Sequence, residues 1–226
     1  MDFGKVLSEA TPLLLEGVKL TIFVSLISLS IGFLVGLLAC IMGLARNPVI
    51  SFISKAYVWV IRGTPMIVQA FVVYFGFPQL IQKTVSPSFT LSAFSAGIIT
   101  LSLNAGAYLS EIFRSGIEAV DPGQIEASRS LGVSSASTMM KIVLPQAFKI
   151  TIPSIVNQFI ITVKDTSILS VIGMAEIVNK AKVYVGSTFQ FFATYILVAA
   201  YYLVVISVLM IVSKFVEKKF RYDKDR

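Results

Sequence analysis

Three polar residues recur on one face of an apolar stretch near the middle of the chain. Asn104, Tyr108 and Glu111 are spaced i, i+4 and i+7, which places an amide, a phenol and a carboxylate on one stripe of a helix. Such groups bind a hydrophilic solute through hydrogen bonds and charge. Glu111 could equally be an ordinary boundary residue, either solvated or paired with Arg114.

A second polar set lies in an apolar stretch nearer the C-terminus. An aspartate or lysine at the centre of a lone membrane helix costs about 2.5–3.5 kcal/mol on insertion scales, so such residues normally face a protein interior or a watery cavity. Lys164 and Asp165 lie near the middle of this stretch, about 100° apart around a helix. They belong to a polar sector formed by Asn157, Gln158, Thr162, Lys164, Asp165 and Ser167. The sector either lines a path for a hydrophilic solute or holds neighbouring helices together by hydrogen bonds.

The segment Arg62-Gly63-Thr64-Pro65 predicts a break in a membrane helix. Pro65 cannot donate to the carbonyl of Ile61, Gly63 weakens the helix beside it, and Thr64 is predicted to cap the helix that resumes. The amino end of that half-helix, with Arg62 close by, offers positive potential at membrane depth. We assign Gln69, which follows, to the same solute pathway. The alternative is a kink that serves only packing.

Several kinds of chemistry are excluded by composition. The 226 residues include no histidine and one cysteine, Cys40, in an apolar run, so neither a disulfide framework nor a Cys/His metal site can form. The chain has no Gly-x-x-x-x-Gly-Lys-Ser/Thr phosphate loop and suggests no nucleophile with a base. The net charge of +7 comes from scattered basic residues without a basic, aromatic-lined face. We expect no enzyme, no bound cofactor and no nucleic-acid partner.

The composition is that of an integral membrane protein. Hydrophobic residues make up 56% of the chain and charged residues 14%, with a mean hydropathy of +0.84, whereas soluble domains carry about 25% charge. The N-terminal apolar run is too long for a signal peptide and lacks a basic leader. We expect one all-α transmembrane domain over residues 1–226, with spans at about 18–45, 52–77, 89–112, 150–173 and 191–213.

The distribution of basic residues predicts the orientation. Thirteen Lys and Arg side chains fall on one side of these five spans and five on the other, with Lys164 inside a span. By the positive-inside rule, residues 114–149 and the C-terminus face the cytoplasm of a multi-pass cell-membrane protein, and the N-terminus faces outward. Five spans cannot divide into two inverted halves, so a symmetric pathway requires a second subunit.

Glycines predict close helix packing along the first span. Gly32 and Gly36 have the small-xxx-small spacing that lets helix backbones approach, and Gly43 extends the same face.

Residues 114–149 lie between two apolar spans and include a polar segment that predicts the start of a helix. Asp121 is expected to cap a helix over about 122–131, with Pro122 at its first position and Gln124 completing a capping box.

A second helix is predicted to follow at once. Gly132 is the expected left-handed terminator of the first helix, and Ser134 or Ser135 then caps a helix that runs to Leu144, where Pro145 interrupts it. The product is a two-helix segment joined at a glycine turn.

Glu126 lies on this exposed segment, three residues before Arg129, at a spacing that suits a weak intrahelical ion pair. Such a pair does not explain the whole hairpin. A bilayer gives no reason for a polar hairpin between apolar spans, so its simplest explanation is a docking surface for a cytoplasmic partner.

The order Glu126-Ala127-Ser128, Gly132, Ile142 and Leu144-Pro145 resembles the EAA loop of bacterial ABC-importer permeases, with Ser128 in place of the second alanine. In that family the loop forms coupling helices that sit in a cleft of the ATP-hydrolysing subunit. The resemblance therefore implies ATPase coupling through Glu126, Ala127, Ser128, Leu131, Gly132, Ile142, Leu144 and Pro145.

Further segments are similar to the polar amino-acid branch of these permeases. They are Arg62-Gly63-Thr64-Pro65, residues 107–114, residues 123–127 and Lys164-Asp165-Thr166-Ser167. The resemblance implies a dimer of permease subunits, identical or closely related, with two ATPase subunits and an extracytoplasmic amino-acid-binding protein. ATP and Mg²⁺ would be used by the ATPase partner.

The same resemblance implies an amino-acid substrate, whose α-carboxylate suits the positive end near Arg62. If Asp165 or Glu111 meets the other end, a basic amino acid is favoured electrostatically. The expected substrate pathway consists of Arg62, Gly63, Thr64, Pro65, Gln69, Asn104, Tyr108, Glu111, Gln158, Lys164, Asp165 and Ser167.

The expected function is that of a permease subunit which moves amino acids inward by alternating access driven by a separate ATPase. One alternative is an ion-coupled secondary amino-acid transporter in which Lys164 and Asp165 bind protons or sodium. Another is a membrane adaptor that only anchors a cytoplasmic protein.

Overall fold

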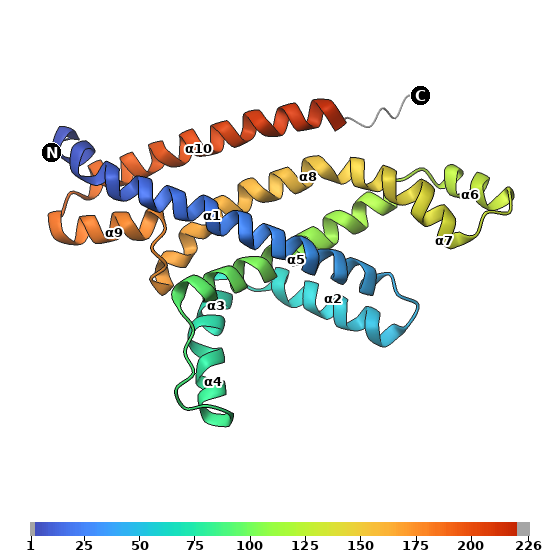
Figure 1. Ribbon diagram of the computed structural model, residues 1–226, viewed down its shortest axis with the longest axis horizontal. Coiled ribbons are helices and arrows are strands. Elements are labelled where there is room, and N and C mark those ends of the chain that lie inside the picture. The colour runs from blue at the N-terminus through green and yellow to red at the C-terminus, as the bar shows by residue number, and fades with distance from the viewer. Residues whose placement is uncertain (1–2, 221–226) are drawn as a thin grey trace.

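The computed structural model describes residues 3–220, which form helices and no β-strand (Figure 1). The helices are α1 (Phe3–Gly43), α2 (Pro48–Gly63), α3 (Met66–Phe71), α4 (Phe77–Thr84), α5 (Ala93–Glu118), α6 (Pro122–Ser130), α7 (Ser135–Thr138), α8 (Leu144–Asp165), α9 (Ile177–Thr188) and α10 (Phe191–Phe220). Two π-helical segments, η1 (Val72–Gly76) and η2 (Met139–Val143), and a 3₁₀ segment, η3 (Thr166–Ile172), continue some of them. The bundle is elongated, with α9 at one end and α6 and α7 at the other.

Helix α1 packs along α5 through small residues. A Cβ added to Gly36 would lie 2.8 Å from both the Gly106 carbonyl oxygen and the Leu109 Cβ, and one added to Gly32 would lie 3.0 Å from the Ala105 Cβ. The close packing predicted for this glycine face is confirmed at both positions. Gly43 differs, because its nearest neighbour is the Ser54 side chain of α2.

The first helix begins fifteen residues before the predicted start at 18, since it starts at Phe3. Its first turns are amphipathic rather than uniformly apolar. Val6, Ala10 and Leu14 recur every four residues and are buried in one cluster with α9, while the charged residues between them stay on the exposed side. Helix α9, which was not predicted, therefore supplies the apolar partner that this amphipathic face requires.

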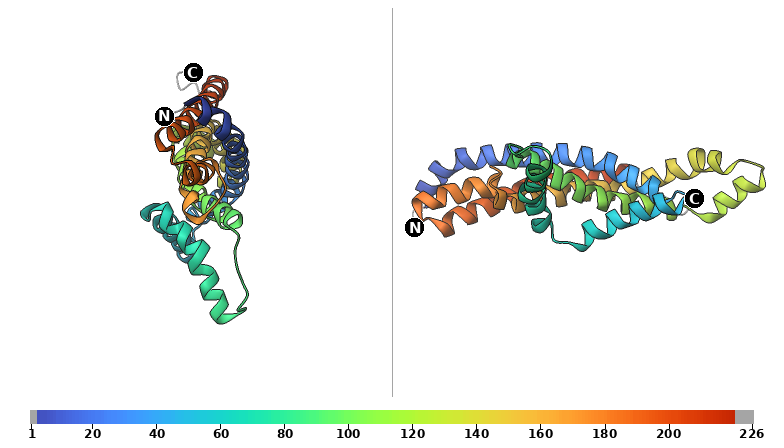
Figure 2. Two further views of the ribbon diagram at one scale, coloured as in Figure 1. Left: turned by 90° about the vertical axis from the view of Figure 1, so that its left-hand side faces the viewer. Right: turned by 90° about the horizontal axis from the view of Figure 1, so that it is seen from below.

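The second predicted span, 52–77, is two helices rather than one. Helix α2 ends at Gly63, helix α3 begins at Met66, and the two parts, Pro48–Gly63 and Met66–Thr84, meet at 108°. Because of this turn, α3 and α4 leave the bundle sideways (Figure 2). The break expected from Pro65 is thus present, and it is sharp.

The predicted interruption at Pro145 is wrong. Residues Ser135–Ile172 form one helix of 38 residues, because η2 passes into α8 without a stop. In this π-helical turn the Leu144 N–H donates to the Met139 carbonyl, five residues back. The wider turn accommodates the missing N–H of Pro145 within a continuous helix.

Glu176 joins the 3₁₀ segment to α9 and is fully buried. Its carboxylate accepts hydrogen bonds from the backbone N–H groups of Val178 (2.9 Å) and Asn179 (2.6 Å), which caps α9. The Tyr202 hydroxyl lies 3.5 Å from the same carboxylate. Burial raises the pKa of Glu176 to about 7, against the opposing effect of these hydrogen bonds.

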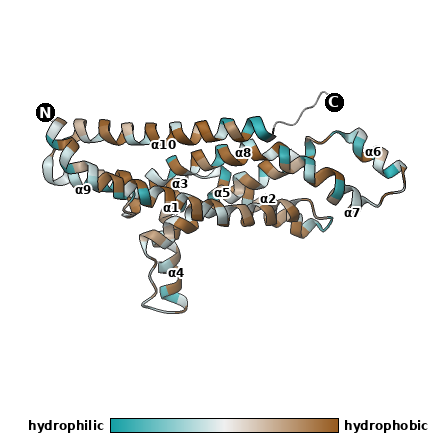
Figure 3. Cartoon of the chain, turned by 45° about the horizontal axis from the view of Figure 1, so that its top comes forward, coloured by the Kyte–Doolittle hydropathy of each residue, from teal (hydrophilic) through white to brown (hydrophobic). Residues whose placement is uncertain are grey.

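Four of the described helices are long and apolar enough to cross a membrane, and the bent pair α2 to α4 makes a fifth if it counts as one span. The predicted bounds 89–112, 150–173 and 191–213 correspond to Ala93–Glu118, Ser135–Ile172 and Phe191–Lys219. Hydrophobic residues cover the middle of the bundle, whereas hydrophilic residues gather on α6, on α7 and near the end of α10 (Figure 3).

Candidate functional site

The break between α2 and α3 exposes backbone groups at the centre of the site. Thr64 and Pro65 are extended, with ψ values of 145° and 136°, so the helical hydrogen-bond ladder is interrupted there. Thr64 does not cap the resumed helix as predicted. Its hydroxyl donates to the Val60 carbonyl of α2 (2.8 Å), and the residue before α3 is Pro65, whose side chain has no hydrogen-bonding group.

Gln69 satisfies the groups that this break leaves without partners. Its Nε2 lies 2.7 Å from the Ile61 carbonyl and 3.0 Å from the Thr64 carbonyl, while its Oε1 accepts a hydrogen bond from Asn104 Nδ2 at 3.1 Å. One side chain therefore holds the end of α2, the start of α3 and the middle of α5 together.

The predicted stripe on α5 faces this junction. Asn104 is buried and bonds Gln69, and the Arg62 Cζ lies 5.3 Å from the centre of the Tyr108 ring. Arg62 Nη1 lies 3.1 Å from the Glu111 Oε2. The structure thus brings together five residues that were assigned to the pathway from separate segments.

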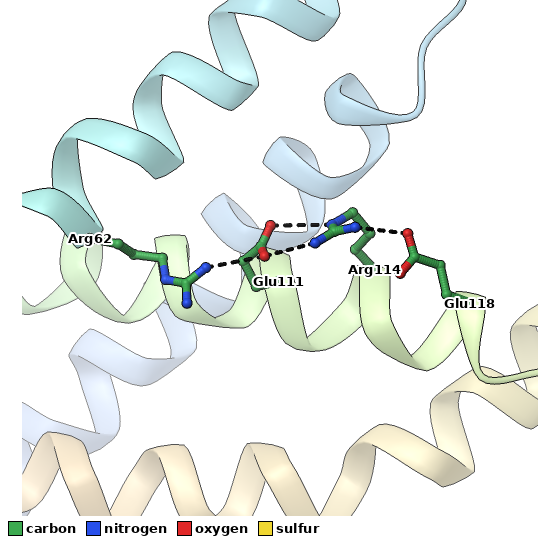
Figure 4. Close-up of polar contacts among 4 residues, drawn as sticks. All are labelled: Arg62, Glu111, Arg114 and Glu118. Atoms are coloured by element: carbon green, nitrogen blue, oxygen red, sulfur yellow. Dashed lines mark hydrogen bonds and ion pairs between the residues drawn. The ribbon is translucent and has the colours of Figure 1, made fainter.

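Glu111 is the centre of a chain of four charges (Figure 4). Arg114 binds both of its oxygens, at 3.2 and 2.9 Å, and also lies 2.8 Å from Glu118. The pairing with Arg114 left open by the sequence is therefore present, but Glu111 additionally reaches across to α2. Ion pairs that are this exposed are each worth only about 0–1 kcal/mol, so the cross-helix contact can exchange partners.

A cavity of about 610 Å³ lies between α1, α2 and α5 beside these charges. Its volume is within the range of small-molecule sites, about 300–1,000 Å³. The polar lining includes Lys55, Arg62, Tyr108, Glu111 and Arg114. This lining presents both cationic and anionic side chains to the cavity.

The polar residues of the predicted fourth span do not join this cavity. Lys164 and Ser167 line a separate one of about 390 Å³, shared with α10. Lys164 and Asp165 are the last two residues of α8, directly before η3, and Asp165 is half-buried. Gln158 is buried, so the sector is divided between the interior and this second cavity.

At the far end of the bundle, α6 and α7 form the expected hairpin. Asp121 Oδ1 accepts from the Gly123 N–H (2.8 Å), and Gly132 has a φ of 79°. The Val133 N–H donates to the Ser128 carbonyl, and the Gly132 N–H to the Arg129 carbonyl, which completes a Schellman motif. Both the Asp121 cap and the left-handed glycine are confirmed, and Ser134 caps α7 through the Ser137 N–H.

Two local predictions for the hairpin are wrong. Gln124 forms no capping box, because its Oε1 accepts from Gln146 Nε2 (2.9 Å) and so holds α6 against α8. Arg129 donates to the Val133 carbonyl instead of pairing with Glu126, which leaves the Glu126 carboxylate on the exposed face.

The predicted coupling residues divide between a surface and a support. Glu126, Ala127 and Gly132 are exposed, and Leu131 at the tip is 84% exposed. Ser128 is buried, with its Oγ 2.9 Å from the Thr138 Oγ1, so it connects α6 to α7. On the π-helical side of the hairpin, Ile142 is half-buried, whereas Leu144 and Pro145 are exposed.

Sequence reasoning missed two groups that shape the site. Tyr57 donates from its hydroxyl to the Leu103 carbonyl (2.6 Å) and thereby fixes α2 to α5 beside the break. Glu118 extends the charge network by one turn of α5. The i, i+4 spacing of Arg114 and Glu118 was a usable signal, whereas nothing in the sequence pairs Tyr57 with a backbone group 46 residues away.

Comparison with known families gives a match over most of the chain. Residues 32–222 match the family described as binding-protein-dependent transport system inner membrane component. The chain is 35% identical over 221 residues to an arginine transport system permease protein, ArtQ, of Bacillus subtilis (strain 168), which covers 98% of both chains. It is 33% identical over 206 residues to a putative glutamine transport system permease protein, GlnP, of Rickettsia typhi, covering 91% of this chain and 92% of that one.

Two solved structures share the fold. A chain from the crystal structure of an amino acid ABC transporter with histidines is 36% identical and superposes with a TM-score of 0.91, over 97% of this chain and 99% of that one. A chain of the MetNI methionine ABC transporter, in an inward-facing conformation, gives a TM-score of 0.76 at 18% identity, over 92% of this chain and 96% of that one. The second likeness concerns the fold alone.

Proposed function

The chain belongs to the family of binding-protein-dependent transport system inner membrane components, and we propose that it is the permease subunit of an ATP-driven importer of amino acids. It is a membrane transport subunit and not an enzyme. One structural observation carries the proposal. A capped, exposed hairpin of short helices projects from one end of a bundle, and the long helices of that bundle are apolar enough to span a membrane. Membership of this family favours the ATP-driven mechanism over the ion-coupled transporter and the adaptor.

The α6–α7 hairpin is the proposed contact with the ATPase. Its exposed face carries Glu126, Ala127 and Leu131, and the Schellman motif at Gly132 fixes the angle between the two helices. Ser128 and Thr138 hold the hairpin from within. A rigid, exposed unit of this kind transmits displacement because it does not deform when a partner pushes on it.

The proposed assembly places the hairpin in the cytoplasm. The positive-inside distribution supports that orientation, with the N-terminus outside and the C-terminus in the cytoplasm. The complex contains two ATPase subunits, which use ATP and Mg²⁺, a second permease subunit that is identical to this chain, and an extracytoplasmic amino-acid-binding protein. This chain itself binds no cofactor.

The proposed substrate is a polar amino acid with a basic side chain. The cavity beside Arg62 and Glu111 offers cations for an α-carboxylate and an anion with an aromatic ring for a side-chain cation. ArtQ of Bacillus subtilis, which is named as an arginine permease, supports the basic class, whereas the GlnP name supports a neutral one.

Replacement of Gly132 by valine tests the coupling role. A valine strains the left-handed backbone at φ 79° although nothing lies within 4 Å of the added Cβ. We expect Gly132→Val to reduce co-purification of the ATPase and ATP-driven uptake in proteoliposomes, while the protein still inserts.

The matched control is Gly173→Val. Gly173 has a φ of 81° and equally open surroundings, but it lies after η3, away from the hairpin. It should lower stability without loss of ATPase binding. Equal effects of the two substitutions on ATPase binding, or normal uptake with Gly132→Val, would remove the coupling role from the hairpin.

A further inference from the structure

We propose that the ion pair between Arg62 and Glu111 fills the substrate site when no substrate is bound. A basic amino acid breaks this ion pair by inserting between the two residues. The substrate's α-carboxylate takes over Arg62, and its side-chain cation takes over Glu111 and Tyr108. This inference rests on the proposed function and specifies the substrate class and the step that opens the site.

The guanidinium of Arg62 lies where the cationic side chain of a basic substrate would bind. Its guanidinium lies over the Tyr108 ring, 5.3 Å from Cζ to the centroid, and its Nη1 is 3.1 Å from the Glu111 Oε2. An aromatic face with an adjacent carboxylate is a common binding arrangement for guanidinium and ammonium groups. The protein therefore places its own guanidinium against the pair of groups best suited to bind a basic substrate.

Arg62 is the replaceable partner of Glu111. Arg114 binds both carboxylate oxygens from the same helix, one turn away, whereas Arg62 reaches only Oε2 from a different helix. The Arg62 side chain is 42% exposed, and that of Glu111 is 30% exposed. Because water screens a pair this open, a solute that offers equal contacts can displace it at little cost.

The backbone around Arg62 has room to move with it. Arg62 lies in the last turn of α2, next to Gly63, where an added Cβ would meet nothing within 4 Å, and the extended residues Thr64 and Pro65 follow. Gln69 continues to hold this break to Asn104 when the ion pair opens. Opening therefore needs only a side-chain rotation and an adjustment of the final turn.

A basic amino acid suits this exchange better than a neutral one. It carries a side-chain cation several bonds away from its carboxylate, so each residue of the broken pair finds a new partner of the opposite charge when the two residues are apart. The only cation of a neutral amino acid is its α-ammonium group, on the same carbon as the carboxylate. It cannot reach Glu111 while the carboxylate binds Arg62 on the other side of the opened pair, so Glu111 keeps Arg114 alone. Lys55, which lines the same cavity, adds a further cation beside the α-carboxylate.

The test compares L-arginine with agmatine, which is arginine without its carboxylate. Equilibrium binding is measured with radiolabelled ligands on the purified permease–ATPase complex. In Arg62→Gln, agmatine no longer competes with Arg62, so its Kd should fall by about threefold or more. Arginine loses its carboxylate partner, so its Kd should rise by about tenfold.

Three further variants serve as controls. Arg46→Gln removes an equal charge from the exposed loop between α1 and α2, and it should change both Kd values by less than about twofold. Arg62→Lys keeps a positive charge without the planar fork and should give intermediate values for both ligands. Arg62→Gln combined with Glu111→Gln should lose the gain for agmatine, since that gain depends on the freed carboxylate.

Opposite changes for the two ligands in Arg62→Gln support the insertion. Parallel weakening of both ligands, or no change in either, overturns it, even if the complex imports arginine normally. Import of only neutral amino acids by the wild-type complex also overturns the insertion and leaves the amino-acid importer intact. A complex that binds and imports no amino acid overturns both proposals.

Discussion

The side-chain amide nitrogen of Gln69 lies 2.7 Å from the carbonyl oxygen of Ile61, which is the oxygen that the N–H of residue 65 would bind in an unbroken helix. Pro65 has no N–H, so Gln69 supplies the missing donor from the next helix. A kink of 108° is thereby stabilised with its polar groups satisfied.

Gln69→Met should destabilise the break because methionine has a similar shape but no donor. We expect a loss of about 1–3 kcal/mol, as two carbonyls and Asn104 lose a partner. Thermal unfolding in detergent measures this loss. Gln82→Met is the control, since Gln82 donates to the single Phe89 carbonyl and should cost less. A smaller loss at Gln69 than at Gln82 would contradict the role of Gln69.

Ser128→Ala should be tolerated in ATPase binding. The substitution removes one buried hydrogen bond, worth about 1 kcal/mol, while Thr138 keeps its bond to the Ser134 carbonyl. Ser128→Leu should instead separate α6 from α7, because Ser128 is buried between them. Pull-down of the ATPase measures both variants, with Ser130→Leu on the exposed side of α6 as the size control. Retention of the ATPase by Ser128→Leu would argue against a rigid hairpin.

Gly36→Ala should destabilise the bundle. The new methyl group would lie 2.8 Å from the Gly106 carbonyl oxygen and from the Leu109 Cβ, so α1 and α5 must separate, at a cost of about 1–3 kcal/mol. Gly76→Ala is the matched control, because its nearest neighbour is 3.9 Å away and its φ of −68° is helical. It should be neutral or stabilising by up to about 1 kcal/mol in the same unfolding assay. Equal melting temperatures for the two variants would contradict the close approach at Gly36.

The buried carboxyl of Glu176, which lies outside the candidate membrane spans, should make the stability of the protein depend on pH. Its pKa in the folded protein is raised to about 7 from a usual value of 4.5, so between these values the folded state binds more protons than the unfolded state. The free energy of unfolding should therefore be highest below about pH 4.5, fall as the pH rises to about 7, and stay level above that pH. The difference corresponds to about 3 kcal/mol.

Glu176→Gln should remove this dependence. Melting temperatures at pH 5 and pH 8 are compared for both proteins, and the wild type should lose several degrees more than the variant between the two conditions. Because every other titrating group is shared, the difference between the two curves isolates Glu176. Parallel curves would show that the carboxyl stays ionised across this range.

Local backbone chemistry made part of the fold predictable. The break at Pro65, the cap at Asp121 and the left-handed Gly132 each depend on a residue's own conformational limits, and all three are present. Pro145 shows the limit of this approach. The missing N–H of Pro145 was expected to end a helix, but the wider π-helical turn at η2 accommodates the proline. The residue types at 139–143 did not predict that turn.

Contacts between distant segments were less accessible from the sequence. The stripe of Asn104, Tyr108 and Glu111 was visible from helical spacing, but its partners Arg62 and Gln69 follow from the direction in which the chain leaves the break. Helix α9 was missed because its 12 residues are too few for a membrane span, and it is stabilised by burial against the first turns of α1. The hydrophobic pattern showed that helices cross a membrane and left open which polar groups meet between them.

The uninterrupted course from Ser135 to Ile172 has a mechanical consequence. A rod of 38 residues extends about 57 Å at 1.5 Å per residue. One end of it is the inner wall of the hairpin, and the other carries Lys164 and Ser167 toward α10. Under the proposed coupling role of the hairpin, a displacement near Thr138 passes along this one helix toward the second cavity, and the π-helical turn η2 and Pro153 are the two places along it where the helix can bend.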